Sequence, residues 1–67
     1  MASVAVLTYP NREGADELAV ILRELGIAAA VVPEEADGYP TRMVWVVRVP
    51  EADAANVRRI LRAIARE

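Results

Sequence analysis

The sequence contains no cysteine and no histidine, and all eight of its basic residues are arginine. These absences exclude disulfide bonds, thiol chemistry, zinc sites built from cysteine and histidine, and histidine as a general base. No lysine is present either, so the hydroxyl groups of Ser3, Thr8 and Thr41 have no histidine or lysine to activate them as nucleophiles. We therefore expect a protein that is not an enzyme and that carries no cofactor and no metal.

The sequence also lacks a long apolar run. No segment approaches the roughly 20 consecutive apolar residues that span a bilayer, and the first residues lack the charged start of a signal peptide. We expect a cytoplasmic protein without a membrane partner. Apolar residues make up 55% of the chain and the net charge is only -2, which favours one folded domain, residues 1–67, over disorder.

A domain of 67 residues is small for independent stability. One core of this size supplies only about 3 to 5 kcal/mol, and additional support is usual. Disulfide bonds cannot provide it, because there is no cysteine. Oligomerisation is the remaining common source of stability, so we expect the chain to associate with itself.

Residues 42–49 are the most apolar run, with the only tryptophan in the middle. They predict a β-strand, since β-branched and aromatic residues fit a pleated, buried surface and Pro40 and Pro50 bound the run. One face of this strand carries Met43, Trp45, Val47 and Val49, and the other carries Arg42, Val44, Val46 and Arg48. Apolar residues on both faces indicate an interior strand. We expect Trp45 in the core, with a partner surface as the alternative.

Four other elements are predicted around this strand. Residues 2–9 form a strand that ends at a Pro-Asn turn, and residues 11–25 form an amphipathic helix with Asn11 as its cap and Gly26 beyond its end. Residues 27–32 form a buried strand, and residues 33–41 an acidic loop. A last helix opens at Pro50, and its apolar stripe contains Ala54, Val57, Ile60, Leu61 and Ile64.

The order strand, helix, strand, strand, helix restricts the topology. A helical crossover requires the first two strands to be parallel, whereas a short loop makes the second and third antiparallel. Both conditions hold if the third strand lies between the other two. The sequence thus predicts an α+β fold with a three-stranded sheet of order 1-3-2 and two helices on one face. This split β-α-β arrangement is a ferredoxin-like fold truncated by one strand.

Two segments carry a resemblance to a known family. In residues 22–32 a helix passes through Leu-Gly-Ile into a strand, and in residues 47–54 a strand passes through Val-Pro-Glu into the last helix. Together with the opening strand, they resemble the small prokaryotic signal-transducing proteins whose fold is akin to PII-like and ferredoxin-like domains. The resemblance implies a regulatory or interaction role without defined catalytic residues. The long nucleotide-binding loop of PII proteins has no counterpart, so ATP binding is not implied.

The best candidate ligand site is the junction of the first strand and first helix. A helix N-terminus presents free N–H groups there, and Arg12 adds a cation. A small-ligand sensor would use Tyr9, Asn11, Arg12 and Arg42; the alternative is a plain turn in which Asn11 caps the helix. Acidic residues also gather at Glu34, Glu35 and Asp37, but their spacing matches no calcium loop.

The last helix suggests nucleic-acid binding as a third function. Arg58, Arg62 and Arg66 recur at intervals of four, without an acidic residue four positions before any of them. The alternative is a solvated face whose cations suit the negative end of the helix dipole. We favour this alternative, because the chain is acidic overall and lacks aromatic residues for base contacts.

We expect a small non-catalytic regulatory or interaction module that forms a homodimer or higher oligomer and has a protein partner. Two helices can cover only one face of the sheet, which would leave an apolar patch on the other. The predicted interface consists of Val4, Val6, Val44, Val46 and Arg48, with Ala5 and Leu7 as alternatives from the first strand. Pairing along the open edge of that strand is the other possible mode of assembly.

Overall fold

In residues 2–38 and 40–65, which the computed structural model describes, three strands and two helices occur in the predicted order. Along the chain the elements are β1 (Ser3–Tyr9), α1 (Arg12–Glu24), β2 (Ala30–Ala36), β3 (Arg42–Pro50), a 3-10 turn (Glu51–Asp53) and α2 (Ala54–Ala65). The α+β class and the order of elements are therefore confirmed.

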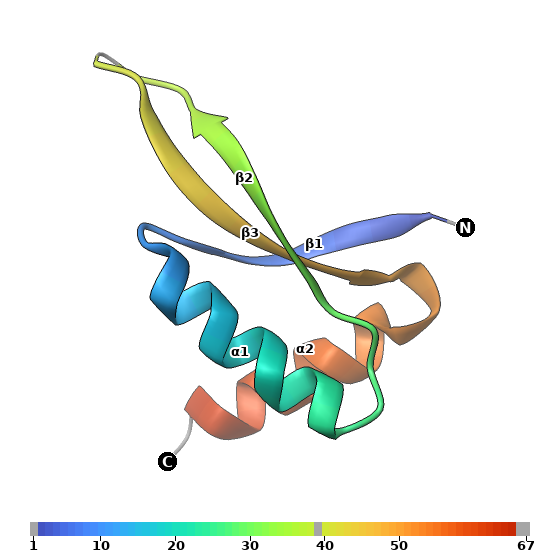
Figure 1. The fold of residues 1–67 in the computed structure, drawn as a ribbon. Coiled ribbons are helices and arrows are strands. Elements are labelled where there is room, and N and C mark those ends of the chain that lie inside the picture. Colours follow the sequence, from blue (N-terminus) through green and yellow to red (C-terminus); the bar gives the residue numbers. More distant parts are fainter. Residues whose placement is uncertain (1, 39, 66–67) are drawn as a thin grey trace.

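The sheet has β3 at its centre. β1 and β2 each pair antiparallel with β3, which gives the strand order β1-β3-β2 and confirms the predicted order 1-3-2. α1 connects the two edge strands, which run parallel to each other, as a crossover requires. Both helices lie on one side of the sheet, and no described element covers the opposite side (Figure 1).

A single apolar layer joins the sheet to the helices. Its buried members are Ala15, Leu18, Ala19, Leu22, Ile27, Ala29, Val47, Val49, Ala54 and Val57. Two alanines on α1 are fully buried, and their small side chains let the helix backbone lie close to β3. Trp45 is partly buried against this layer, next to Val47 on the same face of β3, so it lies at the edge of the core.

Both ends of α1 carry the predicted capping residues. The Asn11 Oδ1 atom accepts a hydrogen bond from the Gly14 N–H at 2.9 Å, which satisfies a free donor of the first turn. At the other end Gly26 has φ 85°, in the left-handed region that favours glycine. The Ile27 N–H then donates to the Leu22 carbonyl at 2.9 Å and closes the helix. The helix ends were therefore predictable from two residues.

β2 lies further along the chain than predicted. The strand begins at Ala30 instead of residue 27, and it continues to Ala36 through residues that the sequence places in a loop. Pro33 is paired opposite Trp45 within the strand. A proline lacks an N–H, but β2 is an edge strand, where that position can face away from the partner strand. The turn signal of proline was therefore misleading at this position.

The longer β2 makes the hairpin with β3 extend beyond the rest of the sheet. β1 ends with Tyr9 opposite Trp45, whereas β2 continues to Ala36 opposite Arg42. The far end of the hairpin consequently projects away from the helices (Figure 1). Met43, which alternates to the helix side, is 48% exposed there.

β1 contains a bulge between Ala5 and Leu7. Before the bulge Val4 lies opposite Val49, and after it Leu7 lies opposite Val47. Both partners are core residues on the helix side, so Val4 and Leu7 face the helices although they are three residues apart. An extra residue in one strand changes the alternation of its faces. The weak alternation of residues 2–9 is therefore interrupted at the bulge.

α2 starts later than the sequence suggests. Pro50 is the last residue of β3, and Glu51–Asp53 form one 3-10 turn before α2 begins at Ala54. The Glu51 N–H donates to the Ala2 carbonyl at 3.1 Å, which holds this turn against the start of β1.

We expect Leu22→Ala to lower the free energy of unfolding by about 3 kcal/mol, because it removes a fully buried side chain and leaves a cavity. That loss is comparable to everything a core of this size supplies. Leu25→Ala, at a 58% exposed position of the same helix end, is the matched control and should cost less than about 1 kcal/mol. Urea denaturation followed by circular dichroism at one protein concentration measures both. Equal losses would contradict the assignment of the core.

Candidate functional site: a groove between the helices

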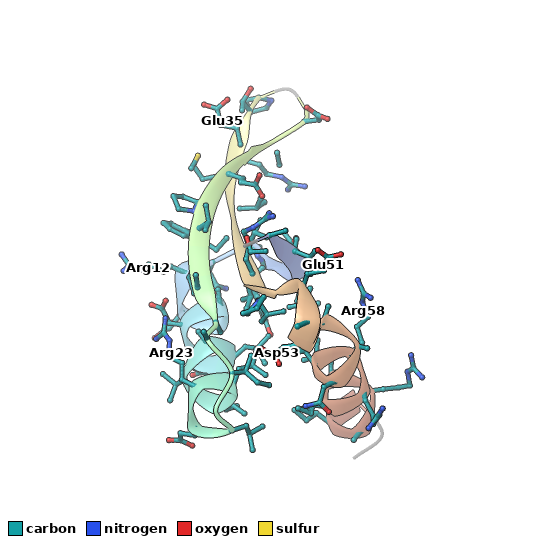
Figure 2. All side chains as sticks on the ribbon, turned by 90° about the vertical axis from the view of Figure 1, so that its right-hand side faces the viewer. Arg12, Arg23, Glu35, Glu51, Asp53 and Arg58 are labelled. Carbon is teal, nitrogen blue, oxygen red and sulfur yellow. The ribbon has the colours of Figure 1, made fainter. Side chains whose placement is uncertain are left out.

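A groove of about 660 Å³ lies between α1 and α2, with β1 at its base. Both helices pack on the sheet, but they make few contacts with each other. Figure 2 shows them as two separate columns below the sheet, with Arg12 and Arg23 on α1 and Arg58 on α2. The apolar side chains that line the groove are Leu7, Leu18, Ile21, Leu61 and Ile64.

Large apolar side chains are unusually exposed along this groove. Leu7 is 38% exposed, Ile21 43% and Ile64 48%. Each comes from a different element, and the groove brings them together. The sequence places Ile21 and Ile64 on the correct, sheet-facing stripes of the helices. It does not reveal that the helices stay apart and leave these stripes partly uncovered.

The two walls of the groove carry opposite charge. Glu17 lines the α1 wall, and Arg58 and Arg62 line the α2 wall. All three are exposed, and no ion pair joins them within the described residues. The one ion pair in that part of the chain is Arg12 Nε to Asp16 Oδ2, at 3.3 Å on the exposed surface of α1.

Tyr9 closes one end of the groove. Burial raises the pKa of its hydroxyl above the ordinary value of 10.0, and the neighbouring Glu17 carboxylate adds to this increase. The ring lies directly over Gly14, where a Cβ atom would be 2.7 Å from Tyr9 Cδ2. Glycine is thus required at position 14 for close approach of the ring, and the ring in turn is fixed against α1.

Three residues of the predicted ligand site, Tyr9, Asn11 and Arg12, lie close together, whereas Arg42 lies apart from them. Asn11 is engaged in capping, and the Arg12 guanidinium lies over the Trp45 ring, 5.6 Å from its centroid. Arg42 precedes Trp45 by three residues on β3, so its side chain lies on the opposite face of the sheet. Tyr9 also lines the groove between the helices.

The predicted oligomer interface is divided between the two faces of the sheet. Val44, Val46 and Arg48 alternate to the open face, whereas Val4 and Val6 pack against the core on the helix side. The placement of Val4 and Val6 beside Val44 is therefore wrong. The β1 residues that alternate to the open face with Val46 and Arg48 are Ser3, Ala5 and Thr8.

The open face offers little exposed apolar surface. Val46 is only 3% exposed between Thr8 and Val32, its register partners. The Arg48 side chain donates to the Ser3 carbonyl at 2.7 Å and to the Ser3 hydroxyl at 3.1 Å, so this cation is tied to the edge of the sheet. None of the large apolar residues exposed in the described part of the chain belongs to this face.

The remaining candidate groups do not form a polar centre. No set of three or more metal-binding side chains gathers in residues 2–38 and 40–65, which include the acidic hairpin. No polar or charged side chain in the same residues is buried. Arg58 and Arg62 line the groove, whereas Arg66 lies outside the described residues.

No family model, curated protein or solved structure matches this chain. The helices that the structure describes are all too short or too polar to span a bilayer. The groove, with its exposed apolar lining and oppositely charged walls, is thus the candidate functional site on geometric grounds.

Gly14→Ala is expected to destabilise the chain, because its methyl group would force the Tyr9 ring to move. In a Tyr9→Ala background the same substitution should instead stabilise the chain by up to about 1 kcal/mol, since alanine favours the helix more than glycine does. A double-mutant cycle of urea denaturation curves measures this change of sign. The same effect in both backgrounds would show that Tyr9 does not rest on Gly14.

We also expect stability to depend on the Tyr9 hydroxyl at high pH. Because the folded chain holds the pKa of Tyr9 above 10.0, its stabilising contribution is complete below that pH and is lost as the pH rises through the folded pKa. Urea denaturation between about pH 8 and 11 should show a smaller decline for Tyr9→Phe than for the wild type. Glu17→Gln removes the neighbouring carboxylate, so it should return the pKa of Tyr9 part of the way toward the ordinary value. Identical declines for all three proteins would contradict this environment of Tyr9.

Proposed function

We propose that this chain is a small, non-catalytic interaction or regulatory module that acts as a homo-oligomer and binds a protein partner. The observation that carries the proposal is the groove between α1 and α2, in which large apolar side chains from three elements are exposed together. Grouped apolar surface on a small folded protein marks a contact surface.

The chemistry of the groove supports binding more than catalysis. Its titratable side chains are Tyr9, Glu17, Arg58 and Arg62, and the helix residues among them are exposed. General acid-base catalysis needs a group whose pKa lies near neutrality, and burial moves the pKa of Tyr9 further from neutrality. A regulatory role also agrees with the resemblance to small signal-transducing proteins.

The shape of the chain supports association. A compact monomer of 7.3 kDa exposes roughly 4200 Å² of surface, whereas this chain exposes 4969 Å². Its radius of gyration is 12.3 Å, against about 11 Å for a compact domain of this length. The molecule is flat, with extents of 36 × 33 × 17 Å. It therefore has surface that an oligomer can bury and that a lone domain leaves in water.

A small-ligand sensor is the second candidate. The volume of the groove, about 660 Å³, lies within the range of roughly 300 to 1,000 Å³ typical of small-molecule sites. Tyr9, Glu17 and the two arginines would supply polar contacts to such a ligand. Nucleic-acid binding is less favoured, because Arg58 and Arg62 stand opposite an acidic wall instead of forming part of a continuous basic surface.

Thermal denaturation over a hundredfold range of protein concentration distinguishes these functions. For a dimer, mass action adds about 2.7 kcal/mol across that range, so we expect Tm to rise by roughly 5 to 10 °C. For a sensor, Tm should rise with an added metabolite and not with the concentration of the protein itself. A Tm independent of protein concentration, with a monomeric mass in sedimentation equilibrium, would contradict homo-oligomeric action.

A further inference from the structure

We propose that the occupant of the groove between α1 and α2 is the same groove of a second copy, in a two-fold symmetric dimer. This inference rests on the proposed homo-oligomeric function and assigns the surface that performs it. It replaces the open face of the sheet, which the sequence suggested, with the helix side.

The charges of the groove are complementary to themselves under a two-fold rotation. The α1 wall is acidic at Glu17, and the α2 wall is basic at Arg58 and Arg62. A two-fold axis that runs along the groove places the α1 wall of each copy against the α2 wall of the other. The acidic wall of each copy then meets the basic wall of the other. The dimer then contains two sets of opposite charges, one on each side of the axis, and these also fix the orientation of the two copies.

The apolar centre of the groove fits the same arrangement. Leu7, Ile21 and Ile64 are exposed between the two charged walls, and two-fold contact would place these side chains against their counterparts. The chain exposes roughly 800 Å² more than a compact monomer of its mass. This excess, to which the projecting hairpin also contributes, is of the size that each partner buries in a standard interface, about 800 Å².

The other two surfaces suit a second copy less well. On the open face Val46 is already buried and Arg48 is bonded to Ser3, so little apolar area would be gained. The free edge of β1 is interrupted by the bulge between Ala5 and Leu7, and a bulged strand does not offer a straight edge for pairing. The groove is the remaining surface with both exposed apolar area and matching charge.

Charge reversal tests the arrangement. Glu17→Arg places like charges on both walls, and so does the double variant Arg58→Glu with Arg62→Glu; each alone should weaken dimerisation by at least roughly tenfold. An equimolar mixture of the two proteins restores opposite charges at both contacts, but only in a mixed pair. We therefore expect a heterodimer to form in the mixture, detectable by native mass spectrometry from the different masses of the two chains.

An apolar variant with a matched control complements the charge test. Ile21→Arg should dissociate the dimer in sedimentation equilibrium, whereas Val20→Arg should not. Val20 is the adjacent residue of α1, is equally exposed at 49%, and does not line the groove. Circular dichroism checks that both variants are folded.

The outcomes separate this inference from the proposed function. A wild-type dimer that keeps its affinity in all groove variants would overturn the inference and leave homo-oligomeric function in place, through the open face or the β1 edge. A wild-type chain that remains monomeric at every concentration would overturn both. Dissociation of each charge variant, with recovery as a heterodimer in the mixture, establishes the two-fold groove contact.

Discussion

Burial of the helix-facing side of β3 is the contact on which the rest of the structure depends. Val47 and Val49 are almost completely buried, and through them the central strand joins the layer between the sheet and the helices. Edge strands join this layer through their pairing with β3, and the helices join it through small or branched side chains. Every element thus contacts a single thin layer. Because the sequence has no cysteine, no disulfide bond supports the fold, and its stability depends on how well that layer is closed.

The same layer explains why the helices leave some of their own apolar side chains exposed. α1 packs across all three strands, while α2 contacts mainly β1. Each helix is positioned by its contact with the sheet, and residues of both helices belong to the same buried layer. The groove is the space that remains between them, and the exposure of Ile21 and Ile64 follows from it.

Charge is distributed between the helices in a way that serves two purposes. Acidic residues near the start of α1 and arginines along α2 suit the dipoles of their own helices. Because the two helices stand side by side, the same choice gives the groove one acidic and one basic wall. The Arg58 and Arg62 stripe, which is ambiguous in the sequence, acquires a specific neighbour once α1 is placed opposite it. Arg62 thus has both places, since it lies in the last turn of α2 and also lines the groove.

The sequence by itself determined the order of elements, the central position of β3, the 1-3-2 sheet and the two ends of α1, because each depends on local signals: residue type, periodicity, Asn11 and Gly26. Only the tertiary structure decided the extension of β2 through Pro33, the bulge that turns Leu7 toward the helices, and the groove itself. A strand tolerates a proline only where the missing N–H would face away from the partner strand. A bulge is defined by the register between two strands. The spacing of two helices depends on contacts between residues that are distant in the chain, and the local periodicity of the sequence does not report such contacts.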